Sequence, residues 1–367
     1  AIFPARRSDP MRATTMPAFR EALTTWGAPS VNMIYADCAG DICWQPAAYV
    51  PRRTGWRGLM PVSGDGAHEW QGYMTAADLP AVENPVSGFV HSANEMNLPA
   101  SWDHDAHPIG FEWFEDGRAD RIAEVISADR ARDIAGNCAL QTDTFSAIAM
   151  ALIALLPDGP AADLLRGWDG HATADSAAAL LYEIWLSRHL RPAMLEKFAP
   201  DPELRKYLAP GNIPTLARML QDDPGHGQIL SDTLAAAWDD TRSIFGRDVT
   251  QWRWGDLHNG YFDHALTPLG ATHDVGPLAT GGSSTTVMMG HYEASDFRVS
   301  NGASVRMVLD VGQWDNSVWI NAPGQSGVPG QSHYDDLAPL WAAGNYVPMP
   351  YSRDAVDAAT QECIGLM

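Results

Sequence analysis

Two side chains in residues 87–121 have the types and positions that carbonyl chemistry needs. A short β run is expected to lead to Asn94 in a turn-rich loop, and a helix start is expected to present Arg121. A carboxamide N–H donor and a fixed cation can together hold an oxyanion or an acyl carboxylate. An acyl-transfer site is therefore the first hypothesis for this chain.

Each of the two residues also has a purely structural interpretation. An asparagine in a turn commonly hydrogen-bonds its own backbone, which would explain Asn94 without any chemistry. An arginine in the first turn of a helix commonly forms a surface ion pair worth less than about 1 kcal/mol, which would explain Arg121. The residues alone favour these structural interpretations.

The run from Asp103 to His107 contains two aspartates and two histidines, which suggests a metal. Carboxylates suit Ca²⁺ and imidazoles suit Zn²⁺. Ligand-type side chains packed so closely cannot all converge on one ion, so one or two of them would bind. A solvated loop is the alternative.

A glycosidase is a further alternative, because the chain has 14 Trp and acidic pairs at Asp239-Asp240 and Asp335-Asp336. Such an enzyme uses two facing carboxylates, and aromatic rings could stack on its sugar substrate. Most of the Trp residues stand at helix or strand spacing, which favours a place in the core.

The composition is that of an ordered globular chain with an acidic surface. Of the 367 residues 46% are hydrophobic, and the net charge of −21 would repel phosphate backbones and anionic lipid, so we expect no nucleic-acid partner. The longest apolar stretch, residues 147–156, is about half of the ~20 residues that a spanning helix needs. We expect no membrane-spanning segment.

Strand patterns at both ends of the chain flank a helical middle section, which indicates an α+β fold. We expect a helix over residues 17–26, a hairpin made by residues 31–36 and 42–50, and strands over 305–311 and 318–321 with the hydrophobic side chains of the former facing inward. Residues 118–246 have helical periodicity. The helices are therefore expected as an insertion between sheet-forming segments, with parts 1–117, 118–246 and 247–367 forming one integrated unit.

Two of the four cysteines flank the expected hairpin turn. Cys38 and Cys43 could face each other across the strands and form a disulfide, which would fit an oxidising compartment. A free cysteine is also a common small core residue, so both states stay open.

Four stretches in this order resemble the penicillin acylase family of N-terminal-nucleophile hydrolases. They are YADCAGDICWQPAAYVP, LMPVSGDGAHEWQGYMTAADLPAVENPVSGFVHSANEMN, RADRIAEV and WDNSVWINAPGQSGVPGQSHYDDLAPLW. The resemblance implies an αββα sandwich and hydrolysis of an N-acyl amide through an acyl-enzyme. The nucleophile in that family is an N-terminal Ser, Thr or Cys whose own α-amine is the general base.

The resemblance also assigns roles to individual residues. Asn94 in SANEMN corresponds to the oxyanion donor, and Arg121 in RADRIAEV to an arginine that orients the nucleophile and the substrate. No catalytic cofactor is implied. A structural Ca²⁺ ion is implied, with Asp103 as the matching carboxylate, Asp105 as its rival and Pro51 as a carbonyl donor.

The start of the chain departs from the family pattern, because Ala1 has neither hydroxyl nor thiol. We therefore expect a companion α-chain and an N-terminal β-segment from the same precursor to supply the nucleophile, and this chain alone to be inactive. The resemblance implies a small-molecule substrate such as a penicillin or an acyl-homoserine lactone, and a periplasmic or secreted location. An inactive relative that binds acyl ligands is the other hypothesis.

Overall fold

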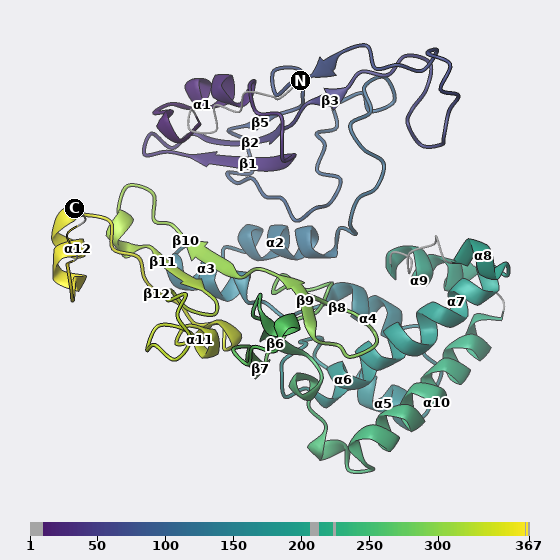
Figure 1. Ribbon diagram of the computed structural model, residues 1–367. Coiled ribbons are helices and arrows are strands. Elements are labelled where there is room, and N and C mark those ends of the chain that lie inside the picture. The colour runs from purple at the N-terminus through teal and green to yellow at the C-terminus, as the bar shows by residue number, and fades with distance from the viewer. Residues whose placement is uncertain (1–9, 206–212, 223–224, 364, 366–367) are drawn as a thin grey trace. The chain divides into compact units, whose positions relative to one another are not determined.

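The structure is a computed structural model that describes residues 10–205, 213–222, 225–363 and 365. The expectation about Ala1 lies outside the described residues. The chain forms two compact units, Ala1–Ala119 and Asp120–Met367. Helix α2 (Gly117–Ser127) begins in the first unit and continues into the second. The chain is shown in Figure 1.

The predicted amphipathic helix is present in the first unit. Helix α1 (Met16–Leu23) follows a single turn, η1 (Pro10–Arg12), and the hydroxyl of Thr15 caps it by accepting from Ala18 N at 3.4 Å. The helix prediction is confirmed, but the predicted end at residue 26 is wrong. The hydroxyls of Thr24 and Thr25 bond back to carbonyls of the last turn and end the helix earlier.

The predicted hairpin is also present. Strand β1 (Val31–Ala36) pairs antiparallel with β2 (Ile42–Ala47), and β5 (Val82–Glu83) adds a third strand to this sheet. The run that the sequence assigned to one strand over 42–50 is divided, since Val50 belongs to β3 (Val50–Pro51), which pairs with β4 (Tyr73–Met74).

The register of the hairpin keeps the two cysteines apart. Cys43 lies opposite Tyr35 and is buried, whereas Cys38 is exposed in the turn. Both are free thiols, so the structure does not form the disulfide that was one of the two possibilities. Burial raises the pKa of the Cys43 thiol, which therefore behaves as a small core side chain.

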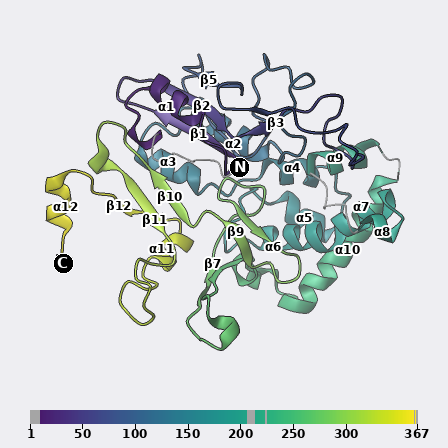
Figure 2. The ribbon, with the colours of Figure 1, turned by 45° about the horizontal axis from the view of Figure 1, so that its top comes forward.

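The second unit begins with a layer of helices, as the periodicity of residues 118–246 predicts. In chain order they are α3 (Ile134–Gln141), α4 (Ala147–Ile153), α5 (Pro160–Arg166), α6 (Ala177–Ile184), the π-helical η2 (Trp185–Leu190), α7 (Arg191–Phe198), α8 (Pro202–Arg205), α9 (Ile213–Asp222) and α10 (His226–Phe245). Helix α10 lies beside α5 and α6 in both ribbon views (Figures 1 and 2). It ends at Gly246, whose φ of 84° is the left-handed conformation that glycine adopts freely.

These helices enclose the main hydrophobic core of the second unit. Its largest fully buried side chains include Trp185, Trp252 and Trp254, which confirms the core role expected for several of the Trp residues. No helix of the described residues is both long enough and apolar enough to cross a membrane.

A histidine is enclosed in this core without a charged partner. The ring of His258 stacks on that of Trp254 with centroids 4.6 Å apart, and its Nδ1 donates to the Phe297 carbonyl at 3.1 Å. Its Nε2 has no hydrogen-bond partner among the described residues. Burial lowers the pKa of His258 from 6.5 to about 4.

The lowered pKa of His258 is expected to make the folded protein less stable at acidic pH. Below pH 6.5 His258 is protonated in the unfolded chain but stays neutral in the folded chain. The free energy of unfolding therefore decreases as the pH falls from 6.5 to about 4. Urea unfolding of wild type and His258→Gln across this window should show an extra loss of up to roughly 3 kcal/mol in the wild type. Free energies of unfolding that change equally with pH in wild type and His258→Gln would contradict the lowered pKa of His258.

The C-terminal part consists of short strands joined by loops. They are β6 (Asn259–Phe262), β7 (Val275–Ala279), β8 (Gly290–Tyr292), β9 (Val299–Gly302), β10 (Val305–Val308), β11 (Val318–Asn321) and β12 (Val347–Pro348), with the single turns η3 (Val249–Gln251), η4 (Trp254–Asp256), η5 (Thr267–Leu269) and η6 (Trp314–Asn316) and the helices α11 (Ala338–Ala342) and α12 (Arg353–Ala359). The strands form the pairs β6-β7 and β8-β9 and the sheet β10-β11-β12.

The sequence placed the strands of both chain ends in one sheet, and the described strands do not pair in that way. Each pairs with a strand of its own unit. The strands of the C-terminal part are short, and irregular register between Gly260 and Phe262 and between His291 and Tyr292 interrupts two of their ladders.

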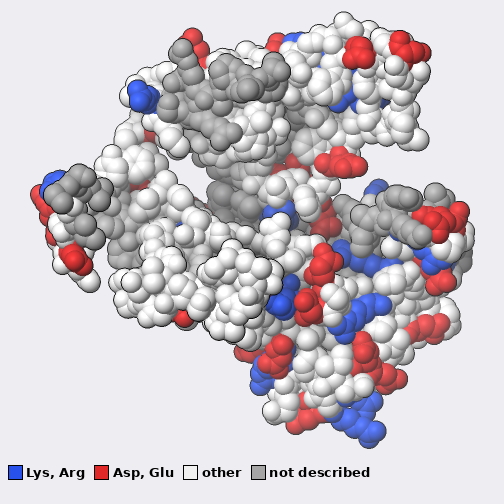
Figure 3. All heavy atoms as spheres, in the orientation of Figure 1, with Lys and Arg blue, Asp and Glu red and all other residues white. Residues whose placement is uncertain are grey.

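Strand β10 is present as predicted, but its inward face is wrong. Arg306 and Val308 are buried, whereas Val305, Met307 and the following Leu309 are exposed. Arg306 is buried because its guanidinium lies over the Trp341 ring at 5.1 Å and donates to the Trp341 carbonyl at 2.9 Å. In Figure 3 the charged side chains of this unit gather over its helical part, and the surface over β10, β11 and α11 is mostly uncharged.

Candidate active site

Asn94 lies in an irregular loop and is held at two points. Its backbone carbonyl accepts from Phe114 N at 3.1 Å, and its side-chain Oδ1 accepts from Nη2 of Arg118 at 2.8 Å. Its φ of 72° is the left-handed conformation, which asparagine tolerates better than most residues. The expected β run before Asn94 is not formed, since residues 88–92 are irregular in the structure.

The hydrogen bond to Arg118 decides which way the carboxamide of Asn94 points. A guanidinium has only donors, so the atom that faces it must be the carbonyl oxygen Oδ1. The NH₂ group is then directed away, and it donates to no group in the part of the chain that the structure describes. Asn94 is exposed, so these N–H groups can reach a ligand.

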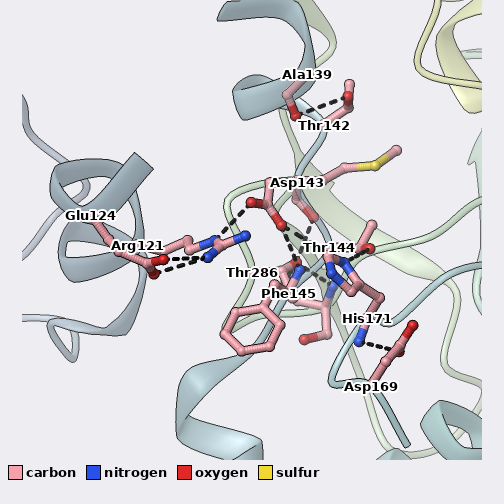
Figure 4. A network of polar contacts seen from close by, with 12 residues as sticks. Arg121, Glu124, Ala139, Thr142, Asp143, Thr144, Phe145, Asp169, His171 and Thr286 are labelled. Carbon is pink, nitrogen blue, oxygen red and sulfur yellow. Dashed lines mark hydrogen bonds and ion pairs between the residues drawn. The ribbon is translucent and has the colours of Figure 1, made fainter. Parts of the chain in front are cut away.

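Arg121 lies on α2, as predicted, and its guanidinium is part of an ion-pair network in the second unit (Figure 4). Nε donates to Asp143 Oδ2 at 2.8 Å, and Nη1 donates to both carboxylate oxygens of Glu124 at 3.0 and 2.8 Å. The cation lies 4.6 Å from the centre of the Phe145 ring. Burial opposes the charge, but the hydrogen bonds to Glu124 and Asp143 outweigh burial and raise the pKa of Arg121.

Asp143 is the centre of this network. Its Oδ1 accepts from Phe145 N at 2.8 Å and lies 3.9 Å from Nδ1 of His171, and its side chain is only 9% exposed. Thr144 Oγ1 lies 3.3 Å from the same His171 nitrogen. The structure thus brings Arg121 together with Asp143 and Glu124, and it brings Asn94 together with Arg118.

The sequence model of the penicillin amidase family matches residues 7–358. The chain belongs to the penicillin amidase family. This membership confirms the family resemblance that the four quoted stretches carry.

Relatives of this penicillin amidase family member include proteins named as acylases. The acyl-homoserine lactone acylase QuiP of Pseudomonas aeruginosa is 27% identical, and the alignment covers 95% of this chain and 48% of the relative. The penicillin acylase 2 proenzyme of a Pseudomonas species is 31% identical, with 94% of this chain and 47% of the relative covered. The chain spans about half the length of the curated relatives it matches.

A solved structure confirms the predicted α+β fold of the N-terminal-nucleophile hydrolase type. A thermostable penicillin G acylase from Alcaligenes faecalis matches with a TM-score of 0.62 at 17% identity, covering 97% of this chain and 70% of that chain. At this identity the likeness shows the fold alone.

The residues predicted to bind calcium have local partners or places in this family member. Asp103 Oδ1 accepts from Ala106 N at 2.9 Å, Asp105 forms an exposed ion pair with Arg57 at 2.8 Å, and Pro51 belongs to β3. The described residues contain no group of three or more His, Cys, Asp or Glu side chains arranged for a metal ion. Calcium binding by Asp103, Asp105 and Pro51 therefore stays a prediction, and ligands from outside this sequence would have to complete the site.

The histidines beside these aspartates also have local partners. His104 Nε2 lies 2.8 Å from the Gly110 carbonyl, and the His107 ring lies against Trp102. In each acidic pair considered for a glycosidase, one aspartate also has a local partner. Asp240 interacts with Arg188 and His189, and Asp336 interacts with His333.

Sequence reasoning did not identify Arg118. The resemblance directed attention to Arg121 in RADR, and the arginine three residues earlier in the same stretch was not considered. The available signal was that both arginines stand in the first turns of the predicted helix.

Proposed function

We propose that the protein to which this chain belongs hydrolyses an N-acyl amide bond, such as that of an acyl-homoserine lactone, a penicillin or a related acyl amide. The observation that carries the proposal is the carboxamide of Asn94, whose acceptor end is occupied by Arg118 and whose donor end is free for a ligand. Membership of the penicillin amidase family and the acylase names of the relatives support it.

In the proposed reaction a nucleophile from outside this chain adds to the amide carbonyl. The developing oxyanion accepts a hydrogen bond from Asn94 Nδ2, the C–N bond then breaks, and the amine leaves with a proton. Water hydrolyses the acyl-enzyme and releases the carboxylic acid. We propose Arg121 as an orienting residue, because Asp143 and Glu124 hold its guanidinium in one position.

We also propose that a companion polypeptide from the same precursor completes the enzyme. The chain spans about half of its curated relatives, and one of these is named a proenzyme. No catalytic cofactor enters the proposal. Export to the periplasm or beyond would suit such an acylase, and we include it in the proposal.

Product analysis of the assembled enzyme tests this function. We expect incubation with an N-acyl-homoserine lactone to yield the free fatty acid and homoserine lactone with its ring intact, both identified by mass spectrometry. Penicillin G is the second substrate, with phenylacetic acid as its expected product. Opening of the lactone ring with the amide retained would contradict the proposal, and tight binding without turnover would favour the inactive acyl-binding relative.

A further inference from the structure

We infer that Arg118 is a positioning residue that orients the Asn94 carboxamide as an oxyanion donor, an inference that rests on the proposed function. The contact that carries it is the hydrogen bond from Arg118 Nη2 to Asn94 Oδ1 at 2.8 Å. Arg118 does not itself reach the reacting carbonyl in this account. It acts through Asn94.

The Arg118 guanidinium allows only one of the two orientations of the Asn94 carboxamide. A primary carboxamide can rotate by half a turn and exchange its oxygen and nitrogen at almost no steric cost. With Arg118 beside it, the rotated form would place NH₂ donors against a guanidinium that can only donate. Arg118 therefore fixes the form in which the N–H groups face away from it.

Arg118 is itself held in place. Only 9% of the residue is exposed, and its guanidinium carbon lies 5.7 Å from the centre of the Phe114 ring. Burial lowers the pKa of Arg118, while the charges of Glu95 and Glu115 raise it. A charge-assisted hydrogen bond in such surroundings is stronger than the same bond in water.

The backbone of Asn94 is fixed from the same segment. Phe114 N donates to the Asn94 carbonyl at 3.1 Å, four residues before Arg118. Glu95, the residue after Asn94, is buried and accepts from Ala93 N at 2.6 Å. Backbone and side chain of Asn94 are thus both held before a substrate arrives, and such preorganisation is what an oxyanion donor needs.

A double-mutant cycle in the assembled enzyme tests the inference. Arg118→Met keeps much of the apolar stem and removes every donor, and we expect it to lower kcat roughly ten-fold with KM little changed. Arg118→Lys restores a charge and a donor, and we expect it to recover part of the loss. In an Asn94→Ala background, Arg118→Met should have no further effect on kcat.

Arg306→Met is the matched control, because Arg306 is also buried, lies over an aromatic ring and donates to a carbonyl. We expect Arg306→Met to lower thermal stability about as much as Arg118→Met does, but to keep the wild-type kcat. An equal kcat loss from Arg118→Met with and without Asn94 would overturn the positioning role alone. Wild-type kcat in Asn94→Ala would instead overturn the oxyanion role in the proposed function.

Discussion

Replacing Asn94 with alanine is expected to lower kcat about 10²- to 10³-fold, equivalent to about 2.7–4 kcal/mol of transition-state stabilisation. The side-chain N–H groups would be lost at the point where negative charge builds on the carbonyl, whereas the ground-state carbonyl depends less on them. KM should therefore change little. Initial rates with an acyl-homoserine lactone, measured at several substrate concentrations, separate the two constants.

The backbone of Asn94 calls for a second variant. At a φ of 72° an alanine side chain is strained, so part of the effect of Asn94→Ala could come from a shifted loop. Asn94→Gly removes the same amide without that strain. Equal losses of kcat in the two variants would attribute the effect to the missing donor.

Asn32→Ala is the control for this experiment. Asn32 lies in the same unit and, like Asn94, accepts a hydrogen bond through Oδ1, here from Trp44 Nε1 at 3.0 Å. Its loss should leave kcat unchanged. An Asn94→Gly enzyme that keeps more than a third of the wild-type kcat would exclude the carboxamide as a main oxyanion donor.

Replacing Asp143 with alanine is expected to reduce the free energy of unfolding by about 3–5 kcal/mol. Arg121, whose side chain is 12% exposed, would lose its buried partner Asp143 and keep only Glu124, whose side chain is 55% exposed, and the Phe145 N–H would lose its acceptor. Leaving a buried charge without its partner costs more than the pair itself contributes. Urea unfolding at neutral pH, followed by circular dichroism, measures the change.

Two further variants make the Asp143 test specific. Asp163→Ala removes a carboxylate that is 73% exposed and 3.7 Å from Arg166, and it should cost less than about 1 kcal/mol. Asp143→Ala combined with Arg121→Met should be less destabilising than the sum of the two single changes. A loss below 1 kcal/mol in Asp143→Ala would show that the network in Figure 4 contributes little to stability.

Local patterns predicted the elements that local physics determines. Helical spacing in residues 17–26 correctly predicted α1, and strand patterns in residues 31–36 and 42–50 correctly predicted the hairpin of β1 and β2. Alternation over residues 305–311 located β10 but gave the wrong inward face. The aromatic ring of Trp341 and its carbonyl make a buried site for Arg306, and no pattern within one strand reveals a distant partner of this kind.

The candidate site was predictable only in part, because sequence patterns do not reveal partners that lie far apart in the chain. Asn94 was identified because its surroundings resemble a known family, whereas its turn position alone favoured a structural role. Arg118 was missed because its partner lies 24 positions away, and the fold alone brings the two together. The expected strand before Asn94 failed because, among the described residues, no neighbouring strand pairs with residues 88–92.

Asn94 and Arg118 lie within 25 consecutive residues, so this segment could be transferred to another protein as one piece. The carboxamide, the guanidinium that orients it and the Phe114 amide that fixes its backbone all come from one continuous stretch of the first unit. Grafting that stretch as a single cassette into a related scaffold would transfer the donor together with its supports, whereas transplanting the asparagine alone would not.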